Sequence, residues 1–308
     1  MGWTSADIGD LTGITVVVTG ANSGLGFEAT KQLVLHGAQV VAACRSLERG
    51  QVCLALPGPG SVDLRELDLA DLGSIADFAA GVVADYPVLD VLLNNAGVMA
   101  LPRSETADGF EMQLGVNHLG HFALTGRLLP ALLAAPAARI ITVSSGAHKM
   151  GKMRFDDLMG TKSYQRWSAY GQAKLANLLF TYELQARLGG AGASAIAVAA
   201  HPGYADTNLQ TAHAKAVGRG IEEKAATLMN KVLGQSAADG ALPELYAATA
   251  PGVQGGDYYG PSRLFESRGA PKLVQPTAAA KDPVDAARLW AESERLTGVT
   301  YSELDRPA

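Results

Sequence analysis

The segment Thr19-Gly20-Ala21-Asn22-Ser23-Gly24-Leu25-Gly26 decides how this chain folds. It directly follows the apolar run Ile14–Val18, and a helical pattern follows it. A tight turn from a strand into a helix favours glycine, because glycine adopts a left-handed backbone without strain. Free amide groups at the start of such a helix bind the phosphates of a dinucleotide. A turn without a ligand is the alternative, but this position predicts dinucleotide contacts from Gly20, Asn22, Ser23, Gly24, Leu25 and Gly26.

Short apolar runs alternate with longer helical patterns along the rest of the chain. The apolar runs do not alternate with polar residues, which is typical of parallel strands covered on both faces. Strands are predicted at Ile14–Thr19, Gln39–Ala43, Val62–Leu67, Val88–Leu93, Arg139–Ser144 and Ser194–Ala199. Helices are predicted at Phe27–His36, Leu72–Asp85, Phe110–Ala134 and Ala169–Leu188, with a last one from Pro283 to a stop at Gly298. This order predicts an α/β fold with a doubly wound, Rossmann-type parallel sheet, as one domain over residues 1–308.

Composition excludes several classes of protein. The 308 residues carry a net charge of −5, which argues against nonspecific nucleic-acid binding. Cys44 and Cys53 are the only cysteines, so a disulfide framework and a four-cysteine zinc site are excluded. No apolar run reaches the ~18 residues of a membrane span, and the first residues do not resemble a signal peptide. We therefore expect a cytoplasmic protein without a membrane anchor.

A tyrosine, a lysine and a pair of serines are candidates for chemistry. Tyr170 and Lys174 are four residues apart on a predicted helix, so they share one face. A nearby ammonium and an oxidised nicotinamide would lower the tyrosine pKa toward a useful range, although a surface helix pair is the alternative. Ser144 and Ser145 end the fifth predicted strand, at the sheet edge where open α/β folds bind ligands.

These motifs together resemble the short-chain dehydrogenase/reductase family over about residues 10–300. The GxxxGxG spacing, Asn94-Asn95-Ala96-Gly97, the YxxxK pair and the segment from Pro202 to Thr207 carry the resemblance. The resemblance implies a catalytic set of Asn117, Ser145, Tyr170 and Lys174, in which Asn117 holds a water that joins Lys174 to a proton relay. It further implies cofactor contacts from Asp68, Leu69, Asn95, Ala96, Gly97, Tyr170, Lys174, Pro202, Gly203 and Thr207.

One spacing points to a particular branch of that family. Tyr170 lies 25 residues after Ser145, whereas about a dozen residues separate this pair in many members. The long form, with VSSGAH and AYGQAKLANLLF, resembles the retinol-dehydrogenase-like branch, which includes WW-domain oxidoreductase and light-dependent protochlorophyllide reductase. A retinoid substrate does not follow from this resemblance. We expect residues 146–168 and 204–240 to cover the substrate.

The end of the second predicted strand indicates which nicotinamide cofactor is used. An acidic residue there usually binds the ribose 2′-hydroxyl of NAD, but this chain has Cys44 followed by Arg45. Arginine suits a phosphate through charged, paired hydrogen bonds. We therefore predict NADP(H), with Arg45 and also Ser46 at the 2′-phosphate. A solvated surface arginine is the alternative.

The predicted function is NADP(H)-dependent hydride transfer to or from the carbonyl or alcohol carbon of a small apolar molecule. A C=C reductase is the first alternative, and a non-catalytic NADP-binding regulatory protein is the second. No metal is expected, because His118 and His121 lack a third ligand and are better explained by packing. The oligomeric state stays open, with a homo-oligomer among the alternatives.

Overall fold

A mostly parallel sheet lies at the centre of the molecule. The structure is a computed structural model and describes residues 2–204 and 235–305. The strands lie in the order β3-β2-β1-β4-β5-β6-β7-β8, and every neighbouring pair from β3 to β7 is parallel. Only β8 runs antiparallel to its neighbour, at the edge. The strands are β1 Thr15–Thr19, β2 Gln39–Cys44, β3 Ser61–Glu66, β4 Val91–Asn94, β5 Arg139–Val143, β6 Ile196–Ala200, β7 Tyr258–Arg263 and β8 Arg268–Leu273.

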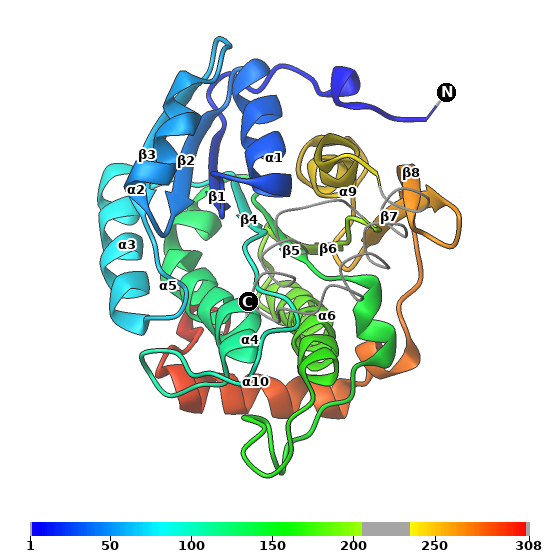
Figure 1. Cartoon of the computed structure of the whole chain (residues 1–308). Helices are drawn as coiled ribbons and strands as arrows, with labels where there is room; N and C mark the ends of the chain where they lie inside the picture. Colours follow the sequence, from blue (N-terminus) through cyan, green and yellow to red (C-terminus); the bar gives the residue numbers. More distant parts are fainter. Residues whose placement is uncertain (1, 205–234, 306–308) are drawn as a thin grey trace.

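Helices cover both faces of this sheet (Figure 1). α1 (Gly24–Leu35) and α9 (Ala237–Thr249) pack on one face, while α3 (Leu72–Asp85), α5 (Gly120–Ala134) and α6 (Arg166–Gly190) pack on the other. Shorter elements connect them: η1 Ser5–Asp7, α2 Leu47–Gly50, η2 Gln51–Ala55, α4 Met112–Leu114, the π-helical turn η3 Gly115–Leu119, η4 Gly146–Met150, η5 Ala278–Lys281 and η6 Ser302–Leu304.

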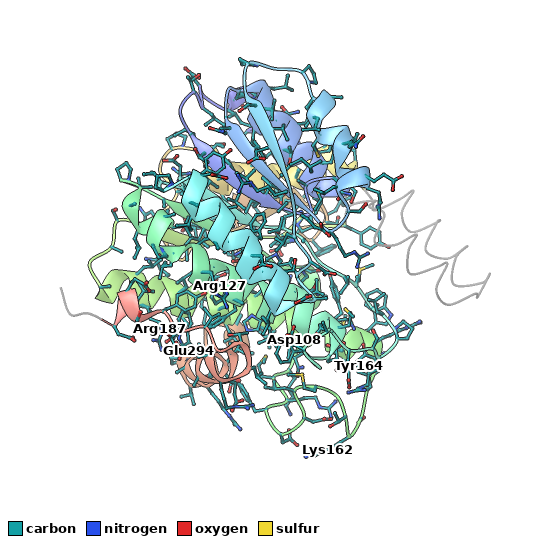
Figure 2. All side chains as sticks on the ribbon, turned by 90° about the vertical axis from the view of Figure 1, so that its left-hand side faces the viewer. Asp108, Arg127, Lys162, Tyr164, Arg187 and Glu294 are labelled. Carbon is teal, nitrogen blue, oxygen red and sulfur yellow. The ribbon has the colours of Figure 1, made fainter. Side chains whose placement is uncertain are left out.

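The last helix, α10 (Pro283–Thr297), packs against α6 near the end of the chain. Asp282 caps its first turn by accepting from the amides of Val284 and Asp285, and Pro283 occupies the first turn. Gly298 ends it with a φ of 67°. Both boundaries confirm the prediction. Figure 2 labels Arg187 of α6 and Glu294 of α10 where these helices meet.

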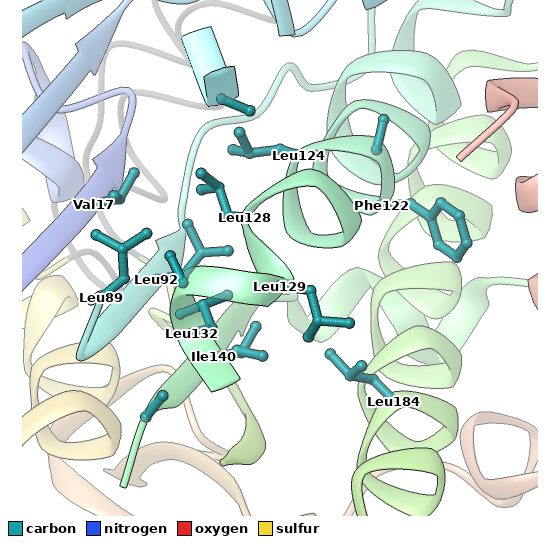
Figure 3. Close-up of a cluster of buried hydrophobic side chains, with 14 of the residues drawn as sticks. Val17, Leu89, Leu92, Phe122, Leu124, Leu128, Leu129, Leu132, Ile140 and Leu184 are labelled. Atoms are coloured by element: carbon teal, nitrogen blue, oxygen red, sulfur yellow. The ribbon is translucent and has the colours of Figure 1, made fainter. Parts of the chain in front are cut away.

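The hydrophobic core forms on both sides of the sheet, which explains the uninterrupted apolar strands. In β1, Val17 faces the α3–α5–α6 side and Val16 and Val18 face the α1–α9 side, and all three are fully buried. Figure 3 shows the hydrophobic cluster on the α3–α5–α6 side, where leucines of α5 pack over β4 and β5. A doubly wound α/β fold in one domain is therefore confirmed.

The structure corrects three element predictions. The fourth strand begins at Val91, three residues later than expected, and β7 and β8 were not predicted. β7 carries Gly260 and Pro261, two residues that weaken a strand signal in the sequence. The predicted helix Phe110–Ala134 is divided into α4, a π-helical turn and α5. Of the expected cover, residues 205–234 lie outside the described residues.

Among the residues that the structure describes, no helix combines the length and apolar character that crossing a membrane requires.

Candidate active site

The glycine turn joins β1 to α1 as the sequence predicts. Gly20 and Gly24 have φ values of 68° and 54°, which L-residues with a side chain rarely adopt. A Cβ atom at Gly26 would clash with the carbonyl oxygen of Gly20 and lie 2.5 Å from Nδ2 of Asn95. Glycine is therefore required here, because the turn and the loop after β4 approach so closely.

Thr19 fastens that loop to the turn. Its buried hydroxyl oxygen accepts from the amides of Asn95 at 3.0 Å and Ala96 at 2.9 Å, while Nδ2 of Asn95 donates to the Thr19 carbonyl at 2.7 Å. The same hydroxyl lies 2.9 Å from Nε2 of His121 on α5. The ends of β1 and β4 are thus held together by polar contacts beneath the ligand-binding edge of the sheet.

A cavity of about 360 Å³ opens above this edge. It brings together twelve of the predicted cofactor residues: Gly20, Asn22, Ser23, Gly24, Leu25, Gly26, Arg45, Asp68, Leu69, Asn95, Ala96 and Gly97. Ser46 lines it as well. Tyr170, Lys174, Pro202 and Gly203 are not part of its wall, and Thr207 lies outside the described residues.

The cavity also contains a second cation that the sequence reasoning missed. Arg49 lines the wall with Arg45, and neither forms an ion pair with a described residue. The Arg49 amide donates to the Ser46 hydroxyl oxygen at 3.3 Å, and this bond caps the short helix α2 (Leu47–Gly50). Arg49 thus lies about one helical turn after Arg45. The four-residue spacing of the two arginines was the available signal. Apolar side chains of Met99, Leu101, Met112 and Val116 complete the wall.

Pro202 and Gly203 follow β6 at the same edge. Gly203 has a φ of 68°, and its amide donates to Nδ1 of His201 at 3.2 Å. Nε2 of Gln235 donates to the Pro202 carbonyl at 2.7 Å, and the Tyr204 amide donates to the Ser267 carbonyl at 2.8 Å. These bonds tie the segment to the β7–β8 hairpin.

Asn117 lies in the π-helical turn and is fully buried. Its side chain donates to the Val98 carbonyl at 2.9 Å and accepts from the Val98 amide at 2.7 Å. Its own carbonyl accepts from Nδ1 of His121 at 3.0 Å, since a carbonyl cannot donate. The side chain therefore positions the loop after β4.

Ser144 and Ser145 make different contacts at the end of β5. The Ser144 hydroxyl donates to the Lys174 carbonyl at 2.8 Å and so ties the strand to α6. The capping role falls to Ser145, whose hydroxyl oxygen accepts from the Ala147 amide at 3.2 Å. Ser145 also hydrogen-bonds the Tyr170 side chain, which lowers the pKa of that phenol.

Tyr170 and Lys174 project from one face of α6 into a buried site. Burial raises the Tyr170 pKa to about 12, despite the Ser145 hydrogen bond, so the lowered value expected from the sequence is absent without cofactor. Nζ of Lys174 lies 5.8 Å from the Tyr170 ring centre and donates to the Val143 carbonyl at 3.0 Å. Burial lowers the Lys174 pKa to about 8. A Cβ at Gly97 would lie 3.5 Å from this ammonium, so the cavity wall reaches the Tyr170–Lys174 pair.

Glu244 on α9 is a buried carboxyl that sequence reasoning did not select. It is 2% exposed, and neither oxygen has a hydrogen-bond partner. Burial raises its pKa to about 8, while the charge of Lys174 opposes that rise. In turn its negative charge raises the Lys174 pKa. A charged residue within the apolar helix ALPELYAAT was the signal in the sequence.

The histidines of α5 and of the π-helical turn hold structure together. Nε2 of His118 lies 2.8 Å from the Ser293 hydroxyl, and burial lowers the pKa of His118 to about 3 and of His121 to about 4. Within residues 2–204 and 235–305, no group of three metal-ligating side chains comes together. His118 contacts Ser293, and His121 contacts Thr19 and the Asn117 carbonyl, so both rings connect elements of the fold.

Comparisons with known proteins agree with the fold and this geometry. A family model described as short chain dehydrogenase matches residues 14–217, and the chain belongs to that family. It is accordingly an oxidoreductase by family, in the retinol-dehydrogenase-like branch.

The relatives and solved structures show how far the likeness extends. Human retinol dehydrogenase 13 is 41% identical over 301 residues, which cover 94% of this chain and 86% of that protein. Human retinol dehydrogenase 11 is 49% identical over 203 residues, which cover 65% of this chain and only 63% of that protein. A crystal structure of an uncharacterized protein from Mycobacterium paratuberculosis has a TM-score of 0.82 and 44% identity, covering 98% of this chain and 99% of that one.

A solved structure with a cofactor is also similar to this chain. It is described as an NAD(P)-dependent gluconate 5-dehydrogenase from Beutenbergia cavernae with bound NADP. Its TM-score is 0.62 at 27% identity, and the match covers 81% of this chain and 95% of that one.

Proposed function

We propose that this protein is an NADP(H)-dependent alcohol dehydrogenase or carbonyl reductase acting on a small apolar substrate. The observation that carries the proposal is the meeting of two features at Gly97. On one side lies a cavity lined by the glycine turn and by Arg45 and Arg49, and on the other lies the buried Ser145–Tyr170–Lys174 group. The chain therefore has a place for a dinucleotide that ends at a proton donor.

A bound nicotinamide cofactor would supply or accept the hydride. The residues of this chain would handle the oxygen and its proton. Ser145 would donate a hydrogen bond to the substrate oxygen, and Tyr170 would give that oxygen a proton in the reductive direction. Lys174 would bind the ribose and stabilise the phenolate by its charge, which offsets the burial that raises the Tyr170 pKa.

Two arginines support NADP(H) over NAD(H). Arg45 and Arg49 line the cavity and form no ion pair with any residue that the structure describes, and Cys44 stands where NAD-binding chains usually have an acid. A charged hydrogen bond contributes ~1.5–3 kcal/mol, or roughly 10- to 150-fold in affinity. We expect Arg45→Ala to weaken NADPH by about that factor and to leave NADH nearly unchanged in calorimetric titrations. Equal weakening of both cofactors would show that Arg45 does not bind the 2′-phosphate.

Apolar side chains beside Tyr170 support an apolar substrate. Trp167 lies one turn before it on α6, with the two ring centres 6.3 Å apart and the indole 37% exposed. Met150 of η4 is 61% exposed and packs over Gly171. These exposed apolar side chains support a role of residues 146–168 in covering the substrate. A cytoplasmic location stays a prediction.

The reaction class is tested by incubating the purified chain and NADPH with matched ketones, aldehydes and enones. The proposal predicts NADPH oxidation with carbonyl substrates and an alcohol as the product. A saturated ketone formed from an enone would instead establish a C=C reductase. Tight NADPH binding without oxidation across the panel would favour the regulatory alternative.

A further inference from the structure

The two cysteines of the chain lie in contact beneath the dinucleotide turn. Cys44 ends β2 immediately before Arg45, and Cys53 lies in η2. Their side chains hydrogen-bond each other, and both thiols are free in the structure. Cys53 Sγ donates to the Ala21 carbonyl at 3.3 Å, while the amides of Ala21 and Asn22 bond the Cys44 sulfur. Both sulfurs therefore form hydrogen bonds with the backbone of the glycine turn.

A buried thiol is normally inert, and these residues are 1% and 0% exposed. The layer that covers Cys53 is nevertheless thin. Cys53 lies in the five-residue 3₁₀ helix η2, which follows the four-residue helix α2. Its chain neighbours Val52 and Leu54 are 46% and 56% exposed. Short 3₁₀ segments at the surface open locally at a fraction of the free energy of global unfolding, so a small oxidant can reach Cys53.

We propose that Cys44 and Cys53 form a reversible disulfide under peroxide, and that this disulfide weakens dinucleotide binding. The second half of this inference rests on the proposed function, because it needs the cavity to hold NADP(H). The first half is independent of any ligand.

The chemistry needs one peroxide molecule. The Cys53 thiolate attacks one oxygen of hydrogen peroxide, which breaks the O–O bond and leaves a sulfenic acid and hydroxide. The Cys44 sulfur then attacks the Cys53 sulfur, the S–O bond breaks and water leaves. Two thiols and one peroxide thus become one disulfide and two waters. Cys53 reacts with the peroxide first because of its hydrogen bond with Cys44. Cys53 accepts this bond, which lowers the Cys53 pKa, and Cys44 donates it, which raises the Cys44 pKa.

The disulfide would alter the turn itself. The Ala21 carbonyl would lose its Cys53 donor, and the sulfurs would approach to the ~2.05 Å of a covalent bond. That approach pulls η2 and the end of β2 together. Asn22, Arg45 and Arg49 line the cavity and belong to the same stretches of backbone, so their alignment with a phosphate would be lost.

The test treats the intact protein with hydrogen peroxide and then removes the oxidant. Mass spectrometry of the digested protein, without reduction, detects a Cys44–Cys53 crosslinked peptide, and calorimetry measures NADPH binding before and after. We expect the crosslink and a loss of NADPH affinity of about tenfold or more, the size of one charged hydrogen bond to phosphate. Dithiothreitol should restore both.

Cys53→Ser and Cys53→Ala are the matched controls, the second guarding against poor packing of a buried hydroxyl. Cys53→Ser keeps a donor for the Ala21 carbonyl and should bind NADPH as the reduced wild type does. Each variant should have the same NADPH affinity before and after peroxide. Absence of the crosslink, or a crosslinked protein with unchanged NADPH affinity, would overturn the inference. Failure of the reduced wild type to bind NADPH at all would instead overturn the proposed function.

Discussion

At the scale of single residues, the site holds a phenol and an ammonium at pKa values that differ from their free values. Burial raises the Tyr170 pKa to about 12 and lowers the Lys174 pKa to about 8. Both shifts oppose the charged form, as expected when groups leave water. Lys174 is therefore the group of this pair whose pKa lies nearer to neutral pH.

This gives a pH prediction for carbonyl reduction. Because deprotonation removes the Lys174 charge, kcat/KM should fall as pH rises through about 8, by about tenfold per pH unit. Glu244→Gln should move the descending limb to lower pH, because the Glu244 charge raises the Lys174 pKa. Lys174→Arg should move it to higher pH. A limb at the same pH in all three proteins would show that another group controls it.

At the scale of elements, the glycine turn was predictable because local sterics determine it. Gly20, Gly24 and Gly26 carry backbone requirements that are visible in the sequence without the rest of the fold. The division of the long helix at Asn117 was not predictable in form. Asn117 lies just before α5 and bonds Val98, which is 19 residues earlier in the chain, so this contact at the π-helical turn is not visible in a local sequence pattern.

The β7–β8 hairpin and Glu244 escaped prediction for similar reasons. β7 is a strand because it pairs with β6, and that tertiary contact outweighs the unfavourable Gly260 and Pro261. The charge of Glu244 is unusual in the apolar helix α9, but its burial and its interaction with Lys174 follow only once α9 packs against the sheet. Long-range contacts, rather than local patterns, decide both features.

The glycine turn yields the prediction at this scale. Gly26→Ala places a methyl group against the Gly20 carbonyl and Asn95, so the turn must open. We expect a loss of about 1–3 kcal/mol in the free energy of unfolding and of at least ~tenfold in NADPH affinity. Gly189→Ala is the control, since no atom lies within 4 Å of its Cβ position. Denaturant unfolding and calorimetry measure both quantities, and normal NADPH binding by Gly26→Ala would contradict this packing.

At the scale of the whole molecule, α10 braces α6, the helix that carries Tyr170 and Lys174. Trp290 of α10 is 2% exposed and stacks on Phe180 of α6 with ring centres 5.9 Å apart. It also contacts Phe122 of α5 at 5.1 Å and Tyr301 at 4.5 Å, and the Arg187 guanidinium lies 4.4 Å from its ring centre. These contacts connect α5, α6 and α10 around one aromatic cluster.

Removing the central ring should therefore affect the stability of the whole fold. Trp290→Ala should lower the free energy of unfolding by about 3–5 kcal/mol, because it leaves a cavity among packed rings. Val284→Ala on the same helix is the control. Its side chain is 74% exposed, and we expect a change within ~0.5 kcal/mol. Chemical denaturation of the three proteins tests this, and similar values for the two variants would refute the bracing role.

The central claim is that Tyr170 gives the substrate oxygen its proton beside a bound NADPH. The most direct measurement is turnover of NADPH by Tyr170→Phe with a carbonyl substrate that the wild type reduces. The variant keeps the ring and loses only the hydroxyl, so NADPH affinity measured by calorimetry should stay near the wild-type value. Turnover should fall by ~10²-fold or more, the usual size of acid–base catalysis. Unchanged turnover in a variant that binds NADPH normally would contradict the account.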